Sequence, residues 1–385
     1  MNILFHFRTQ GTGAEGVHIA GMAGAFRRLG HSVVFSSPSS IDPSATAGEN
    51  PFLPRQRSLL ARLAAHAPAV LFELLEIAYN ALAGVRLGAL LRREHFDLIY
   101  ERHAFFLCIT AFLAQRHRVP LVVEVNELAG DERVRADPWL LPLARLADRF
   151  TFQRARLIVV VSPHLQRRIE AMGIRKEKIL VLPNAIDEET LHVLPDGTSI
   201  RRRYQCESAV VVGFAGWFVP WHRLDVLVAE FAALAPGKAE LRLMLVGDGT
   251  LRVNLEAQAS ALGIRDRLIL PGAVPHAEMP DYLAAMDICV IPHSNAYRSP
   301  IKLFEYMAGA RAIVAPCTEP IALVLRDGEN GLLFDPSNDG ALRIQLAALV
   351  DSPAFRSRLG QQAREDVCQK HTWTQNAREL LLRLG

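Results

Sequence analysis

Short apolar runs rich in β-branched residues alternate with stretches of helical periodicity along almost the whole chain, and no other feature constrains the fold as strongly. The run at 2–7, for example, is followed by a helical pattern at 17–29 in which Ile19 and Phe26 share one apolar stripe. Such alternation is typical of βαβ units, whose strands form a parallel sheet. We therefore predict an α/β protein with strands at 2–7, 32–35, 98–100, 121–125, 157–161, 179–182, 210–214, 241–246, 268–270, 288–291 and 312–315.

A polar Pro-Asp-Gly-Thr-Ser stretch at 195–199 interrupts this rhythm, which then begins again. The 385 residues are also more than one core of ordinary size needs. We predict two doubly wound, Rossmann-like domains at 1–195 and 196–365, with ligands bound in a central cleft at the carboxyl ends of the strands. A last helical pattern, 366–385, is left without a domain; packing back on the N-terminal domain is one alternative.

Charge and cysteine usage exclude several classes of partner and location. The chain has 43 basic and 40 acidic residues, too even a balance for a nucleic-acid-binding protein. Its five cysteines are dispersed without metal-ligand spacing, which indicates reduced thiols in the cytoplasm. The first predicted strand starts at Asn2, so we expect no secretory signal.

The most apolar region, 59–91, is interrupted by Glu73, Glu76 and Arg86. These charges predict one or two amphipathic helices rather than a membrane-spanning one. Packing against the domain core is the favoured interpretation. Contact with a membrane surface is the alternative.

A glycine-rich segment follows the first predicted strand and opens a helix. Gly11, Gly13 and Gly16 have the spacing of a dinucleotide-binding loop. Such a site also needs a carboxylate at the end of the second strand, and none occurs before Asp42. A dinucleotide-dependent oxidoreductase is therefore a weak alternative. Glycines at a helix N-terminus still suit the phosphates of another ligand, so Gly13 and Gly16 remain candidate binding residues.

The second half of the chain carries the segment Ser-Pro-Ile-Lys-Leu-Phe-Glu-Tyr-Met-Ala-Gly at 299–309. It resembles the donor-site helix of the retaining glycosyltransferases of family four. Further segments stand in that family's order, and the resemblance covers nearly the whole chain: 181–187, 213–216, 245–249, 271–275 and 327–333. Three segments of the first half are similar to a bacterial subgroup that acts in surface or exopolysaccharide assembly: 15–18, 97–102 and 124–126. The resemblance implies the GT-B fold, with the donor held by the C-terminal domain.

The resemblance also assigns roles within the donor-site helix. Ser299 is expected to cap the helix, with Pro300 in its first turn, so that backbone N–H groups face the donor diphosphate. Lys302 would supply a full positive charge to the leaving group. Glu305 would accept the ribose hydroxyls. A simple surface pair of Lys302 and Glu305 is the less favoured alternative. The turns at Gly216, Gly247 and Val274 are similar to those around the family's nucleotide.

Two departures from the family's pattern concern the donor. Tyr297 stands where many relatives carry a glutamate that contacts the sugar. The family's donor-loop arginine and lysine are replaced by Trp217 and His222. His222 or Arg223 is therefore expected to meet the diphosphate, and Arg223 is favoured because arginine is always charged.

In the N-terminal domain, relatives often present a histidine after the strand at 98–100. The local register leaves Arg102 or His103 to match it. His103 would hydrogen-bond a donor hydroxyl or phosphate, with a helix-cap role as the alternative. Glu124, near the end of the next strand, would orient or deprotonate the acceptor. His18, beside the glycine loop, is either a ligand group or part of helix packing.

Taken together, these features predict a cytoplasmic, retaining hexosyltransferase, also able to act at the inner face of a membrane. It would move a sugar from a nucleoside-diphosphate donor to a glycan, glycolipid or small-molecule hydroxyl, as in polysaccharide and cell-wall biosynthesis. No Asp-x-Asp metal motif occurs, so we expect no metal and no other cofactor. A nucleotide-sugar epimerase or a phosphorylase is the alternative. The base, the sugar and the acceptor stay open.

Overall fold

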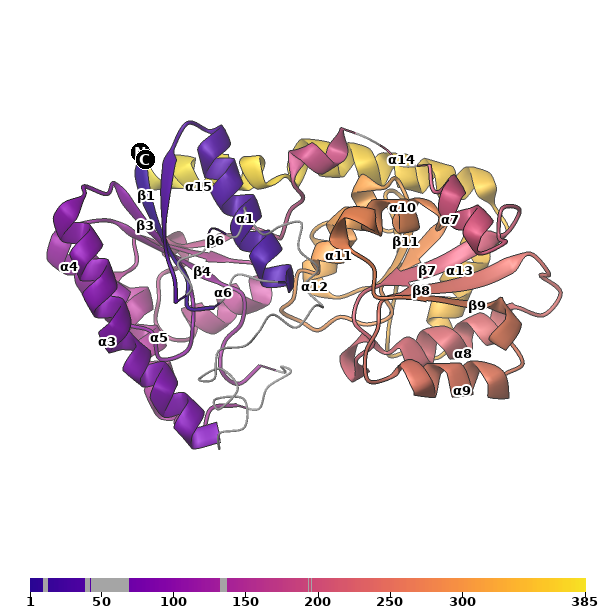
Figure 1. Cartoon of the computed structure of the whole chain (residues 1–385), viewed down its shortest axis with the longest axis horizontal. Coiled ribbons are helices and arrows are strands. Elements are labelled where there is room, and N and C mark those ends of the chain that lie inside the picture. Colours follow the sequence, from indigo (N-terminus) through magenta and orange to yellow (C-terminus); the bar gives the residue numbers. More distant parts are fainter. Residues whose placement is uncertain (10–12, 39–41, 43–68, 132–136, 193, 195) are drawn as a thin grey trace. The chain divides into compact units, whose positions relative to one another are not determined.

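The computed structural model describes residues 1–9, 13–38, 42, 69–131, 137–192, 194 and 196–385. They form two compact units (Figure 1). The first comprises the described residues up to Pro183 together with Trp373–Gly385, and the second comprises Asn184–Thr372. The division falls after Pro183 rather than at the predicted 195, because Asn184 is already hydrogen-bonded to Ser299 of the second unit.

The sheet of the first unit is entirely parallel, with the strand order β2-β1-β3-β4-β5-β6. The register places Phe5 beside both Phe35 and Tyr100. All strands predicted for this half are present: β1 (Asn2–His6), β2 (Ser32–Ser36), β3 (Leu98–Arg102), β4 (Leu121–Val125), β5 (Leu157–Val160) and β6 (Ile179–Val181).

Helices pack in two groups in this unit: α1 packs with α15, while α4 packs with both α3 and α5. In α1, a Cβ at Gly21 would lie 2.3 Å from the indole nitrogen of Trp373, so glycine permits the close approach of α15. The tail predicted as one segment, 366–385, is divided: α14 ends at Lys370 in the second unit, and α15 belongs to the first. The helices are α1 (Gly13–Arg28), α3 (Ala69–Arg93), α4 (Ile109–His117), α5 (Leu141–Arg154), α6 (Pro163–Glu170) and α15 (Trp373–Leu384).

The second unit repeats the scheme with a parallel sheet in the order β12-β11-β10-β7-β8-β9. Val211 and Val212 of β7 lie in different apolar clusters, one on each face. Burial of both faces explains why these strands read as continuous apolar runs. The strands are β7 (Val210–Ala215), β8 (Leu241–Val246), β9 (Leu268–Gly272), β10 (Ile288–Val290), β11 (Ala312–Pro316) and β12 (Leu332–Phe334).

Helices cover both faces of this second sheet. Residues of α8, α9 and α13 build one apolar cluster, and residues of α7, α10, α11 and α14 build the other. Their bounds are α7 (Thr198–Arg203), α8 (Leu224–Leu234), α9 (Arg252–Ala261), α10 (Met279–Ala284), α11 (Ile301–Ala308), α12 (Glu319–Ala322), α13 (Ala341–Val350) and α14 (Pro353–Lys370).

Each sheet reverses its strand order beside its first strand. β1 lies between β2 and β3, and β7 lies between β8 and β10. In doubly wound sheets, ligands bind beyond the carboxyl ends of the strands at such a reversal. A ligand site is therefore expected among the residues that follow β1, β3 and β4 in the first unit, and β7 and β8 in the second.

Candidate active site

In the first unit, polar side chains converge on Glu124 near the end of β4. One carboxylate oxygen contacts His18 Nε2 at 2.8 Å and accepts a hydrogen bond from the Tyr100 hydroxyl at 2.6 Å. The other accepts hydrogen bonds from Arg102 Nη1 and Asn126 Nδ2, each at 2.5 Å. The Glu124 side chain is almost completely buried. Four partners therefore saturate a single buried carboxylate.

Sheet order brings these partners together from distant parts of the chain. β3 and β4 are neighbours, and their register sets Arg102 opposite Glu124. The first turns of α1 supply His18 and also Glu15, whose carboxylate accepts a hydrogen bond from Arg102 Nε at 3.1 Å. The cluster thus joins α1, β3 and β4, and it includes Glu124 and His18, which the sequence had nominated.

The charges in this cluster are balanced locally. Burial alone would raise the pKa of Glu124, but the positive charges of His18 and Arg102 outweigh it and hold that pKa well below its ordinary value. Burial and the neighbouring Glu124 carboxylate raise the pKa of Tyr100 well above its ordinary value. Glu124 is therefore a permanent carboxylate, and Tyr100 is a permanent hydrogen-bond donor.

His103 lies outside this cluster. Its Nε2 contacts the Asp148 carboxylate of α5 at 2.8 Å, and its ring packs against Phe105 and Phe152. Side chains alternate between the faces of a strand. Arg102 therefore points toward Glu124, whereas His103, the next residue, points toward α5. The two candidates at this position therefore have different partners, Glu124 for Arg102 and Asp148 for His103.

In the second unit, Lys302 lies in the first turn of α11. Its Nζ is 3.4 Å from His222 Nε2 and 4.0 Å from the centre of the Phe214 ring. His222 Nδ1 lies 2.7 Å from the carbonyl oxygen of Trp217. Because a carbonyl only accepts, Nδ1 carries the proton and Nε2 presents its lone pair to the Lys302 ammonium. His222 is thus a neutral partner and brings no negative charge.

Two glycines shape the backbone beside Lys302. A Cβ at Gly216, where φ is 145°, would lie 2.7 Å from Lys302 Nζ. A Cβ at Gly247, where φ is 133°, would lie 1.9 Å from the carbonyl oxygen of Gly216. Both the backbone angle and the lack of space require glycine. The turns after β7 and β8 therefore lie directly against one another, with the ammonium on top of Gly216.

Burial shifts the ionisable groups around α11. It lowers the pKa of Lys302 to about 7, which Glu305 partly opposes. Burial, followed by the charge of Lys302, lowers the pKa of His222 to about 3. Burial also raises the pKa of Glu305, against the effects of His276 and Lys302. Among the described residues, Lys302 forms no ion pair within 4 Å of its Nζ, so the more distant Glu305 compensates its charge only in part.

Two arginines of the second unit differ in their surroundings. Arg223 is half exposed and pairs with Asp225, whose carboxylate lies 3.2 Å from Arg223 Nε. Arg298, by contrast, lies near enough for its charge to lower the pKa of His222, an effect smaller than those of burial and Lys302. Arg298 Nε also donates to the Tyr297 hydroxyl at 3.2 Å. Arg298 was not predicted from the sequence. The one sequence feature that could have indicated it is its position just before the 299–309 segment.

The expected helix cap at Ser299 is wrong. Pro300 occupies the N-cap position, and no side chain caps the helix. The Ser299 hydroxyl instead accepts a hydrogen bond from the Asn184 backbone N–H at 3.0 Å, and the Asn184 side chain donates to the Ser299 carbonyl at 2.6 Å. Tertiary pairing with Asn184 outcompetes the local cap and leaves the first turn of α11 without one.

The other predicted binding residues lie at the start of α1 and after β9. Gly13 is the first residue of α1, and Gly16 is buried in its first turn; Gly11 lies outside the described residues. Val274 follows β9 and packs into the apolar cluster of α10 and α11. Within the described ranges, no three His, Cys, Asp or Glu side chains converge as metal ligands would.

Comparison with known protein families gives two matches in series. Residues 15–190 match the family "Glycosyltransferase Family 4", and residues 209–352 match "Glycosyl transferases group 1". The alpha-D-kanosaminyltransferase of Streptomyces kanamyceticus is 22% identical over 64% of this chain and 65% of its own length. A D-inositol 3-phosphate glycosyltransferase of Stackebrandtia nassauensis is 27% identical over 74% of this chain and 67% of its own length. This chain thus spans less than two thirds of the kanosaminyltransferase.

Solved structures agree with the observed architecture. Anabaena HepE in complex with UDP superposes with a TM-score of 0.73 at 20% identity, covering 100% of this chain and 99% of HepE. The sucrose-phosphate synthase of Thermosynechococcus elongatus superposes with a TM-score of 0.69 at 18% identity, covering 99% and 98%. These likenesses, with the two parallel six-stranded sheets, establish the predicted GT-B fold.

Proposed function

We propose that this chain, which contains a glycosyltransferase family 4 domain followed by a glycosyltransferase group 1 domain, moves a sugar from a nucleoside-diphosphate donor to an acceptor hydroxyl. The second unit binds the donor, and the anomeric configuration is retained. Retention is inferred from the resemblance of the 299–309 segment to retaining enzymes.

The observation that carries the proposal is the charge of Lys302, which forms no ion pair and is compensated only in part by Glu305. Its ammonium lies on Gly216 and faces a neutral His222, and burial lowers its pKa to about 7. A buried cation without a counter-ion is costly, and a diphosphate would supply the missing negative charge. That charge increases on the leaving group as the sugar departs, so contact with Lys302 strengthens in the transition state.

Neighbouring groups suit the remaining parts of a nucleotide. Glu305 lies one turn beyond Lys302 on the same helix face, where it can accept both ribose hydroxyls. The charge of His276, which follows Val274, acts to lower the pKa of the Glu305 carboxylate. The proposed ribose and base contacts therefore lie close together. HepE, which shares the fold, was solved with UDP and with UDP-glucose. A uridine diphosphate sugar is accordingly the first donor to test.

On the acceptor side, we assign Glu124 an orienting role. A carboxylate with four hydrogen-bonding partners and a strongly lowered pKa is a poor proton acceptor. It can hold His18 and Arg102 in fixed positions, and these two side chains then face the acceptor. The acceptor class is a glycan, glycolipid or small molecule, and the reaction is placed in the cytoplasm.

A ligand-dependent stability screen tests the donor assignment. UDP, GDP and ADP sugars are added to the parent protein, to Lys302→Met and to Lys238→Met, whose lysine pairs with Asp351 at the surface. At 100 times its Kd, a ligand stabilises the folded state by roughly 2.7 kcal/mol. We expect one nucleotide to raise the Tm of the parent and of Lys238→Met and to have less effect on Lys302→Met. Equal shifts in all three proteins would place the nucleotide elsewhere.

Product analysis tests the reaction. NMR of the anomeric proton during turnover in excess chelator should show the donor's configuration in a product that carries the acceptor. An inverted product would contradict retention, and activity restored only by Mg²⁺ would contradict metal independence. Conversion of the nucleotide sugar without any acceptor would instead identify an epimerase.

A further inference from the structure

The helix α3 of the first unit has an unusual polarity. Its outward side is a continuous apolar stripe over four turns, and the six large members are 41% to 70% exposed: Val70, Leu71, Leu74, Leu75, Leu82 and Val85. We call these six residues the α3 stripe. Their spacings of three, four and seven residues place them on one side of the helix, with the exposed Ala78 between Leu75 and Leu82. Soluble domains rarely leave such a contiguous apolar surface uncovered.

The charged side chains in the middle of α3 are directed inward. The Glu73 carboxylate accepts hydrogen bonds from the backbone N–H groups of Trp139 and Leu140. Glu76 pairs with Arg8 at 2.8 Å, and Arg86 donates to the carbonyl of Ser37 at 2.9 Å. These three charged residues interrupt the apolar segment in the sequence, but in the structure their side chains are bonded within the first unit. They do not interrupt the exposed stripe.

Length and composition alone would let Val70–Arg93 cross a membrane, and only 17% of its most apolar window is buried. Topology rules out a span here. The helix connects β2 to β3, and both strands flank β1 in one parallel sheet. A crossover of this kind must return to the sheet it left. The stripe can therefore meet a bilayer only by lying along its surface.

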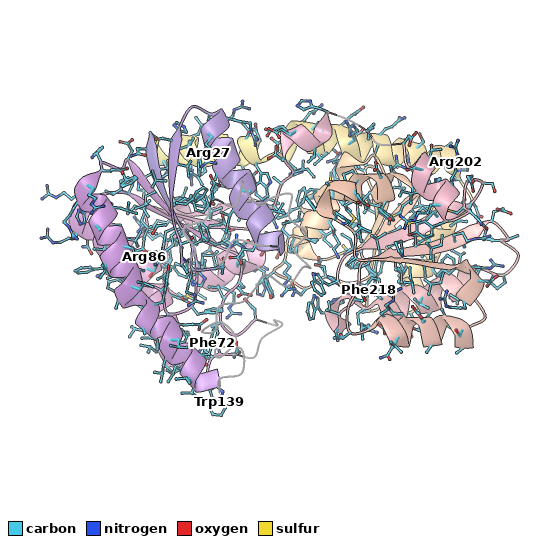
Figure 2. The ribbon with its side chains drawn as sticks, viewed as in Figure 1. Arg27, Phe72, Arg86, Trp139, Arg202 and Phe218 are labelled. Atoms are coloured by element: carbon cyan, nitrogen blue, oxygen red, sulfur yellow. The ribbon has the colours of Figure 1, made fainter. Side chains whose placement is uncertain are left out.

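Charge and an aromatic side chain suit such a surface. On α3, α4 and α5, all three acidic residues, Glu73, Glu76 and Asp148, have at most 10% of the side chain exposed. Exposed basic side chains on the same helices are Arg92, Arg93, Arg116, Arg145, Arg149 and Arg154. Trp139, 74% exposed, lies at the end of α3 that carries Phe72 (Figure 2). Tryptophan prefers the boundary between lipid and water.

We propose that the α3 stripe and Trp139 dock the first unit onto an anionic phospholipid surface, with the arginines of α3, α4 and α5 facing the lipid headgroups. The inference is independent of the transfer reaction proposed above. Apolar side chains enter the headgroup region, and basic residues add an attraction that salt screens. An acceptor carried on a lipid would then be concentrated at the same surface.

Vesicle sedimentation tests this proposal on the full chain. The parent is mixed with phosphatidylglycerol/phosphatidylcholine vesicles and with pure phosphatidylcholine vesicles. We expect binding to the anionic vesicles that weakens at high salt. The variant L71E/L75E/L82E should bind at least about tenfold more weakly, since three half-exposed leucines lose their insertion. The control V253E/I344E/L382E changes three apolar residues that are even more exposed but lie away from α3, and it should bind as the parent does.

Three outcomes would overturn the proposal. The parent could fail to bind anionic vesicles, or the control could lose binding as much as the stripe variant. Sedimentation velocity could instead show a parent dimer that the stripe variant dissociates, in which case a second copy of the chain covers the stripe. Circular dichroism and the Tm of the stripe variant should match those of the control, which separates lost docking from lost folding.

Discussion

The two units share a fold but treat charge at the carboxyl ends of their strands in opposite ways. In the first, Glu124 is surrounded by four hydrogen-bonding partners, two of them basic side chains. In the second, Lys302 faces a neutral His222 and has no carboxylate within 4 Å among the described residues. The first cluster is complete without a ligand. In the second, Glu305 balances the cation only in part, and an anionic ligand would complete the balance.

This contrast separates positioning from binding. A buried carboxylate whose hydrogen bonds are all satisfied holds its neighbours in place, so its removal mainly lowers the stability of the fold. A cation without an ion-pair partner slightly lowers the stability of the folded state, and that stability increases when an anion binds. Substitutions in the Glu124 cluster should therefore destabilise the fold, and substitutions at Lys302 should remove activity.

Glu124→Gln should lower the free energy of unfolding by about 3–5 kcal/mol, because it leaves the buried Arg102 guanidinium and the His18 ring without the carboxylate that both contact. Urea unfolding at neutral pH measures this loss. Glu15→Gln is the matched control, since Glu15 also pairs with Arg102 but is 30% exposed, and it should cost at most about 1 kcal/mol. Equal losses in the two variants would show that Glu124 is not the centre of the cluster.

Lys302→Met should not lower stability but should reduce turnover by about 10²–10³, equivalent to roughly 3–4 kcal/mol, because contact with the leaving diphosphate is lost in the transition state. The loss should fall mainly on kcat, since base and ribose contacts still bind the donor. Steady-state kinetics provide the measurement, with Lys238→Met as control. A folded variant with turnover within a few-fold of the parent would remove Lys302 from the mechanism.

Arg298→Met should reduce turnover by about tenfold, because its charge acts on His222, the neighbour of Lys302. Arg223→Met should change turnover by less than about twofold, because Arg223 pairs with Asp225 at the exposed start of α8. Assays of both variants at saturating donor decide between them. The reverse order would restore the role that the sequence favoured for Arg223.

The smallest effect concerns protons. Burial lowers the pKa of Lys302 to about 7, and a bound diphosphate should return it toward its ordinary value of 10.5. Nucleotide binding at pH 8 should therefore take up a proton, which calorimetry in buffers of different ionisation enthalpy detects. Lys302→Met should bind without this uptake. Uptake that persists in the variant would assign the proton to another group.

The stability of the free protein carries the same signature. Between pH 7 and 10.5 the unfolded chain keeps the Lys302 proton that the folded chain has lost, so the contribution of Lys302 to stability rises with pH across this window. The slope of unfolding free energy against pH should be smaller in Lys302→Met than in Lys238→Met. Equal slopes in the two variants would show that burial does not shift the pKa of Lys302.

The sequence by itself determined the features that depend on neighbouring residues. Alternating apolar runs predicted every strand of both sheets up to β11, because burial on both faces leaves an unmistakable apolar pattern. The three-residue spacing of Lys302 and Glu305 placed both on one side of a helix. The glycines at 216 and 247 marked turns that no larger residue can occupy.

Only the tertiary structure decided which distant residues meet. His18 and Glu124 are joined by the order of strands in the sheet, and Ser299 turns from its helix to Asn184. Arg102 rather than His103 reaches Glu124 because of the register between β3 and β4. The outward direction of the α3 stripe follows from how α3 packs on its neighbours. Pairings across the chain depend on topology and register, and local periodicity contains neither.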